Sequence, residues 1–98
     1  MTLTNDELSS LVKKYQPITR YTTGEDEQHL MFFLQNNKEI SVSIKKNNEI
    51  FEALGQLRNL NQRGFGEASG IMKADSELEV VENILTNLIE FDLKRKNR

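Results

Sequence analysis

Few side chains in this sequence could do chemistry near neutral pH. His29 is the single histidine, and histidine is the side chain whose ordinary pKa lies in that range. Glu25, Asp26 and Glu27 precede it, so their carboxylates could raise its pKa or join it around a metal ion. A metal site needs ligands at spacings that bring them to one point, and this run matches no such motif. We therefore interpret these residues as an acidic surface turn followed by a strand, and we expect no metal site.

Two other patterns suggest catalysis but lack the necessary context. The glycines within residues 64–70 resemble a phosphate-binding loop, but they follow a predicted helix rather than a strand, and no P-loop lysine follows them. Ser41, Ser43 and Ser69 have no recognisable triad relation to His29. Paired carboxylates of the glycosidase type need a large cleft, which a chain of 98 residues can hardly enclose. We expect no catalytic residue, no cofactor and no enzyme activity.

The C-terminal residues form a basic tail at 94–98. Lys94, Arg95, Lys96 and Arg98 could contact phosphates, as basic helix ends often do. The nearest aromatic residue, Phe91, lies on the predicted buried face, so no stacking platform accompanies these charges. Basic residues also complement the dipole at a helix C-terminus. We interpret the tail as a solvated helix end and keep nucleic-acid contacts through these four residues as the alternative.

Composition excludes several classes of function. A chain of 98 residues is the size of one small domain. Its 13 basic and 15 acidic residues give a net charge of −2, whereas general nucleic-acid-binding domains are usually strongly basic. The absence of cysteine excludes disulfides, thiolate metal sites and cysteine nucleophiles. The N-terminus does not resemble a signal peptide, and the longest apolar run, residues 30–34, is far shorter than the ~20 residues that span a bilayer. We expect a cytoplasmic protein with no membrane partner.

The first half of the chain has clear periodicity. Thr4 and Glu7 have the spacing of a capping box, and apolar residues follow at helical spacing, which predicts a helix at 4–15. Pro17 ends this helix. Residues rich in β-branched and aromatic types, or alternating between apolar and polar, then predict strands at about 18–23, 28–35 and 39–45.

The hairpin between the second and third predicted strands has two candidate registers. A two-residue loop at Asn36 and Asn37 places Ile40 opposite Phe33. A three-residue loop places Ile40 opposite Leu34, but it puts Lys38 in a strained left-handed conformation. We slightly favour the two-residue loop.

The second half shows helical spacing instead. Asn47 or Asn48 could cap a helix at about 48–62, in which Gly55 would indicate close packing and whose apolar residues are Ile50, Phe51, Leu54, Leu57 and Leu60. Residues 64–74 predict a flexible loop, and a second capping box predicts a last helix at 76–93. Together these elements predict an α+β fold: a single small domain of order α-β-β-β-α-α, with a three-stranded antiparallel meander packed against helices.

We expect from these features a small non-catalytic protein-interaction module, such as a stoichiometric inhibitor, an immunity or antitoxin-type protein, or a mobile-element accessory protein. The partner would be another protein, bound through the acidic residues Glu25, Asp26 and Glu27 and through Phe65 and Met72 of the predicted loop. The two-sided apolar strand at 30–34 also suggests a homo-oligomer. The alternatives are a dimeric nucleic-acid-associated regulator that uses the basic tail, or a self-assembling structural component.

Overall fold

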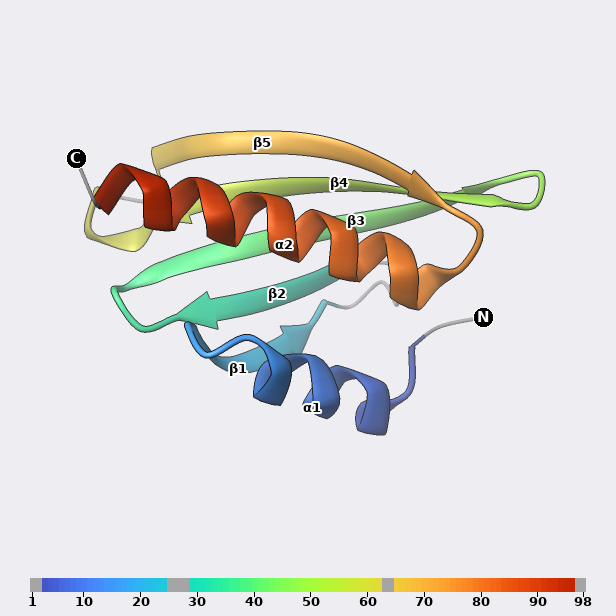
Figure 1. Ribbon diagram of the computed structural model, residues 1–98, viewed down its shortest axis with the longest axis horizontal. Coiled ribbons are helices and arrows are strands. Elements are labelled where there is room, and N and C mark those ends of the chain that lie inside the picture. Colours follow the sequence, from blue (N-terminus) through green and yellow to red (C-terminus); the bar gives the residue numbers. More distant parts are fainter. Residues whose placement is uncertain (1–2, 25–28, 63–64, 97–98) are drawn as a thin grey trace.

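The chain forms a five-stranded antiparallel sheet with a helix at each end of the sequence (Figure 1). The structure, a computed structural model, describes residues 3–24, 29–62 and 65–96. The strands are arranged in the sheet in the order of the sequence. The elements are α1 (Asn5–Lys14), β1 (Ile18–Thr23), β2 (His29–Leu34), β3 (Lys38–Asn47), β4 (Ile50–Asn59), the short 3₁₀ helix η1 (Leu60–Gln62), β5 (Phe65–Ala74) and α2 (Glu77–Lys96).

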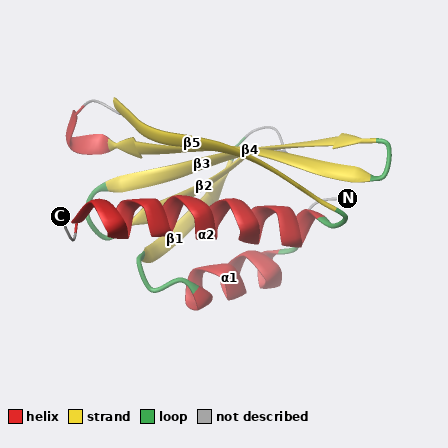
Figure 2. Ribbon diagram, turned by 45° about the horizontal axis from the view of Figure 1, so that its top comes forward, coloured by secondary structure: helices red, strands yellow, loops and turns green. Residues whose placement is uncertain are grey.

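Both helices lie on the same face of the sheet (Figure 2). The long helix α2 packs mainly against β4 and β5, and α1 packs against β1. Tyr15 joins the two helices, because its hydroxyl lies 2.8 Å from Oγ1 of Thr86 and donates to the carbonyl oxygen of Glu82 at 3.2 Å. The core lies between helices and sheet and includes Phe32, Ile40, Val42, Ala53, Leu57, Val80, Val81, Ile84 and Leu85, all fully buried.

The N-terminal predictions are confirmed. Thr4 caps α1 by accepting a hydrogen bond from the Glu7 amide at 3.1 Å, and the Glu7 carboxylate accepts from the Thr4 amide at 3.0 Å. The first strand has the predicted bounds, and β2 and β3 occupy the predicted regions, with β3 extending to Asn47. The last helix is also confirmed, and it continues to Lys96, so the described part of the basic tail is helical.

The predicted fold class is wrong in its second half. The order is α-β-β-β-β-β-α, with five strands and two helices instead of a three-stranded meander with three helices. Residues predicted as a helix at 48–62 form β4 and η1. The helical spacing placed Leu54 on the same buried face as Leu57, but Leu54 is 51% exposed and Leu57 is fully buried. The segment is a strand, so successive side chains point to opposite faces of the sheet: Gly55 and Leu57 face α2, and Leu54 faces away from it.

The flexible loop predicted at 64–74 is also wrong, since residues 65–74 form β5. This strand pairs with β4 along its whole length, with one irregularity opposite Leu57 and Arg58. Its small residues had suggested a loop. They are compatible with an edge strand because the strand's backbone is satisfied by β4 and its inner face is covered by α2.

Neither predicted register of the β2–β3 hairpin is correct. Ile40 pairs with Phe32, and the three-residue loop spans 35–37. Asn37 takes the left-handed position, with a φ of 59°. Asparagine tolerates this conformation better than lysine does, so moving the loop by one residue avoids strain at Lys38 and still aligns the apolar faces of both strands.

Candidate functional site

One face of the sheet carries no helix in the described ranges, and we call it the uncovered face. Ile84 and Leu88 of α2 approach Gly55 from the opposite side, and both helices lie on that side in Figure 2. Because side chains alternate between the faces of a strand, Leu54 and the side chains in register with it point away from the helices. The uncovered face is therefore the face of all five strands that carries Leu54.

The most exposed apolar residues of this face lie on β4 and β5. Leu54 pairs directly with Ile71 across the two strands, and these side chains are 51% and 61% exposed. Ile50, which is 46% exposed, lies on the same face of β4 near the tip of the β3–β4 hairpin. Large apolar side chains that are exposed next to one another, rather than singly, are typical of interaction surfaces. We call Leu54 and Ile71 the apolar pair.

The apolar residues at the other end of the uncovered face are less exposed than the apolar pair. Met31 and Phe33, on β2, are half-buried. The guanidinium of Arg20, on β1, lies 3.9 Å from the centroid of the Phe33 ring, which is cation–π geometry. Arg20 thus covers Phe33, and no charged group is placed in this way over the apolar pair in the described contacts.

Charge on the uncovered face is predominantly positive. Its two carboxylates are both paired, Glu39 with Arg58 at 3.2 Å and Glu52 with Lys73 at 3.7 Å. Two further cations in the described part of this face are Arg20 and Lys45. The described face therefore has four cations against two carboxylates, although the whole chain has a net charge of −2.

His29 and Ser43 form a side-chain pair that the sequence did not reveal. They are register partners on β2 and β3, and Nε2 of His29 lies 2.8 Å from Oγ of Ser43. The pair resembles a base next to a nucleophile, but β3 is a central strand, so its backbone amides are engaged in the sheet. An oxyanion site needs free converging donors, and we interpret the pair as a cross-strand hydrogen bond.

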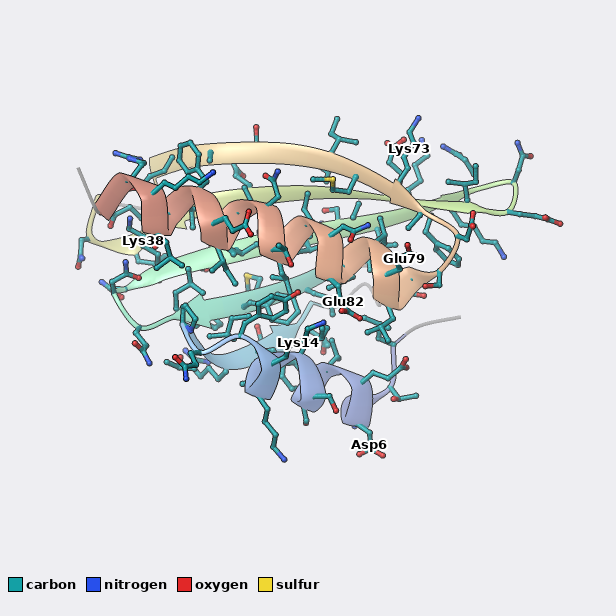
Figure 3. The ribbon with its side chains drawn as sticks, in the orientation of Figure 1. Asp6, Lys14, Lys38, Lys73, Glu79 and Glu82 are labelled. Atoms are coloured by element: carbon teal, nitrogen blue, oxygen red, sulfur yellow. The ribbon has the colours of Figure 1, made fainter. Side chains whose placement is uncertain are left out.

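A second group of polar side chains lies on the helix side, near the last turns of α2. Lys38 forms ion pairs with Asp92 at 2.6 Å and with Glu67 at 2.9 Å, and Arg95 lies 3.5 Å from Glu67 (Figure 3 labels Lys38). We call these four residues the Lys38 cluster. The carboxylates of Glu67 and Asp92 are 9% and 5% exposed, so they are largely withdrawn from solvent, whereas the side chain of Arg95 is half exposed.

Electrostatics within the Lys38 cluster favour the charged forms of Lys38 and Glu67. Burial opposes the charge of Lys38, but hydrogen bonds to Asp92 and Glu67 outweigh this, and the pKa of Lys38 lies above its ordinary value. The hydrogen bond from Lys38 holds the pKa of Glu67 below its ordinary value, although burial works against this. With two cations and two carboxylates, the cluster is neutral. Its position indicates that it fastens the end of α2 to β3 and β5, and we assign it no ligand.

Of the residues predicted to bind a partner, the structure describes the side chain of Met72. Glu25, Asp26 and Glu27 lie outside the described residues, as does the side chain of Phe65. Met72 lies on β5 and packs partly buried against the core, on the helix side. The acidic surface that the sequence suggested therefore stays a prediction.

The predicted nucleic-acid contacts are only partly placed. Lys94 and Arg95 are exposed near the end of α2. Arg95 contacts Glu67 and lies 5.9 Å from the centroid of the Phe91 ring. The side chain of Lys96 and all of Arg98 lie outside the described residues.

Comparison with known proteins gives no relationship, since no family model, no curated protein and no solved structure matches the chain. No group of three or more histidine, aspartate or glutamate side chains in the described ranges is placed to hold a metal ion. Neither helix in the described part of the chain is long and apolar enough to cross a membrane. The uncovered face is thus the feature on which a proposal of function can be built.

Proposed function

We propose that the chain is a non-catalytic protein-interaction module that binds its partner protein through the uncovered face. The observation that carries this proposal is the apolar pair, because Leu54 and Ile71 are each more than half exposed on adjacent strands. Exposed apolar residues grouped on a sheet cost free energy in water and contribute binding energy when a partner covers them.

The charges around the apolar pair indicate the chemistry of the partner. Lys73 and Lys45 flank the two residues, and the carboxylate of Glu52 is already paired with Lys73. A partner surface with a central apolar side chain and surrounding carboxylates would match this face by electrostatic complementarity. This polarity is opposite to the basic partner that the acidic residues of the sequence suggested. The stoichiometric inhibitor and the immunity or antitoxin-type binder remain the kinds of protein that we propose.

The test is a quantitative affinity capture from host lysate, with and without nuclease, in which wild-type bait is compared with a variant of the apolar pair. The variant Leu54→Ser/Ile71→Ser removes the apolar pair. The matched control is Leu93→Ser, because Leu93 is 45% exposed but lies on α2. The proposal requires that a protein is captured in stoichiometric amount and that its capture survives nuclease treatment. This protein must be lost with the double variant and retained by the control.

Charge reversal provides the second arm of the test. With the captured protein purified, Lys45→Glu should slow its association and weaken the dependence of the rate on salt, because like charges would then meet at the interface. Glu49→Lys, an exposed charge change at the tip of the β3–β4 hairpin, is the matched control. Retention of the partner by the Leu54→Ser/Ile71→Ser variant would refute the proposal, as would capture that depends on nucleic acid.

A further inference from the structure

The outer edge of β5 is the longest unpaired strand edge in the described structure. β5 has ten residues, and β1 at the other edge has six. Figure 1 shows β5 at the border of the sheet with no other element beside it. Proteins usually protect such edges with prolines, charges or bulges. On β5 the charges are Glu67, at the bulge, and Lys73, near the end, so Ala68 to Met72 form an uncharged segment.

The turn between β3 and β4 determines which backbone groups of β5 face this edge. Asn47 and Ile50 are paired across a two-residue turn, so they form a hydrogen-bonded pair. Along an antiparallel ladder every second pair of opposed residues is hydrogen-bonded. Counting in twos from Asn47 and Ile50 leads to Asn37 and Leu60, and the Leu60 amide does donate to the Asn37 carbonyl, at 3.0 Å. On β4, the residues that bond to β5 are therefore those in phase with Gly55, and Gly55 pairs with Gly70.

Between the bulge and the end of the strand, this alternation leaves three residues of β5 with free backbone groups. Gly70 and the residues in phase with it direct their amides toward β4. The N–H and C=O groups of Ser69, Ile71 and Lys73 therefore point to the open edge. Their side chains lie on the uncovered face, so the free backbone groups and the apolar pair adjoin each other.

We propose that this edge pairs with the same edge of a second copy of the chain, in an antiparallel register centred on Ile71. In this register Ile71 lies opposite its own symmetry mate, and Ser69 lies opposite Lys73. All three of these residues then exchange hydrogen bonds, and Lys73 lies opposite the uncharged Ser69. The apolar pairs of the two copies merge into one apolar strip across the two-fold axis.

The position of α2 fits this arrangement. A Cβ atom at Gly70 would lie 3.5 Å from atoms of Ile84 and Asn87, and one at Gly55 would contact Ile84 and Leu88, so α2 runs below the gap between β4 and β5. With strands about 5 Å apart, the two-fold axis then lies about 5 Å from the helix axis. The two α2 helices would be about 10 Å apart, which is a normal helix-packing distance.

The helix surfaces that would face each other are complementary. Asn83 and Phe91 lie one turn before and after Asn87, so they lie on the β5 flank of α2, and Phe91 is 40% exposed. The two-fold axis makes the helices antiparallel. The acidic first turn of one copy, where Glu79 is exposed, therefore lies beside the basic end of the other. This charge complementarity favours a second copy over an unrelated strand.

A proline at Ser69 is the test variant. Its amide points to the open edge, so proline there should leave the pairing with β4 intact and block the dimer. The matched control is Thr23→Pro on the edge of β1. The bond from the Gly24 amide to the His29 carbonyl, at 3.0 Å, shows that Gly24 faces β2, so the amide of Thr23 points outward. Ser69→Pro also keeps Leu54 and Ile71, so failure of the dimer is distinguishable from failure of the proposed function.

Sedimentation velocity at about 100 µM protein measures the outcome. We expect twice the chain mass of 11.4 kDa for the wild type and for Thr23→Pro, and at least a tenfold weaker dimer for Ser69→Pro. A monomeric wild type would overturn the proposal. So would a dimer that Ser69→Pro does not weaken while its circular dichroism spectrum stays native.

Cysteine cross-linking tests the register, because the chain has no cysteine of its own. Opposed residues in a hydrogen-bonded pair have Cα atoms about 5.5 Å apart, which a disulfide can bridge. Ile71→Cys should therefore cross-link with itself under mild oxidation. Ser69→Cys and Lys73→Cys should each stay monomeric on a non-reducing gel but cross-link when mixed. Efficient self-cross-linking of Ser69→Cys, without that of Ile71→Cys, would refute this register.

Discussion

The contact between α2 and the sheet can be tested by adding one methyl group at Gly55. A Cβ atom at this position would overlap Cγ1 of Ile84 and would lie 3.0 Å from Cδ1 of Leu88. Both side chains are essentially fully buried, so neither can rotate into solvent to make room. The backbone of Gly55 is not left-handed, so the effect of Gly55→Ala reports packing alone.

The expected magnitude is the difference of two effects. Overpacking a core by one methyl group costs about 1–3 kcal/mol. Replacing glycine by alanine recovers about 0.4–1 kcal/mol, because it restricts the unfolded chain. Because the overlap involves two buried side chains, we take the overpacking cost at about 2–3 kcal/mol and expect Gly55→Ala to lower the free energy of unfolding by about 1–2.5 kcal/mol, a fall in Tm of roughly 4–20 °C for a domain of this size.

Urea unfolding followed by far-UV circular dichroism measures this change, at one protein concentration because dimer stability depends on concentration. Gly70→Ala is the matched control. Its Cβ would lie 3.5 Å from Asn87 and Ile84, an ordinary contact, so we expect no loss or a gain of up to ~1 kcal/mol. In an Ile84→Ala background the overlap with Ile84 disappears and only the tight contact with Leu88 remains, so Gly55→Ala should then destabilise much less. Equal effects of the two glycine substitutions in the wild type would refute the packing argument.

Three further changes have defined outcomes. Thr4→Ala removes the capping box and should cost about 0.5–2 kcal/mol in urea unfolding. Lys38→Met leaves the carboxylates of Glu67 and Asp92 without their shared cation and should cost about 3 kcal/mol. The pKa of Glu67 is lowered in the folded state, so its contribution to stability is complete above the ordinary glutamate pKa and is lost as pH falls through the lowered value; acid titration of stability should show a smaller loss in Lys38→Met. Asn37→Val should cost about 1–2 kcal/mol by thermal unfolding, because a β-branched residue is strained at a φ of 59°.

The first half of the fold is predictable because its local signals agree with its tertiary contacts. The capping box at Thr4 and Glu7 and the apolar face of α1 specify one structure, and Pro17 separates helix from strand. The register of the β2–β3 hairpin depends on which loop residue takes the left-handed conformation. Sequence alone placed the loop incorrectly, although the preference of asparagine for positive φ would have selected Asn37.

The second half was mispredicted because its local signal is ambiguous. Apolar residues at Ile50, Leu54 and Leu57 fit a helical face, and the alternation of Ala53, Gly55 and Leu57 fits a strand. The asparagine dipeptide at 47–48 was interpreted as a helix cap, although the same dipeptide at 36–37 was interpreted as a turn. The structure has Asn48 at a φ of 57° in a hairpin turn. Pairing with β3, and contact with α2, which is distant in sequence, decide the conformation.

The error at β4 also concealed the candidate site. In a helix, Leu54 and Leu57 lie on the same face, and both would be buried. In a strand they lie on opposite faces, so burying Leu57 beneath α2 necessarily exposes Leu54 on the other side of the sheet. Ile71 is exposed for the same reason, because it pairs with Leu54 and points to the same side of the sheet. The sequence had suggested a loop at residue 71, and a loop does not predict which side of a sheet a side chain occupies. The apolar pair therefore results from the pairing of two strands, and neither of its residues could have been recognised as part of a surface before that pairing was known.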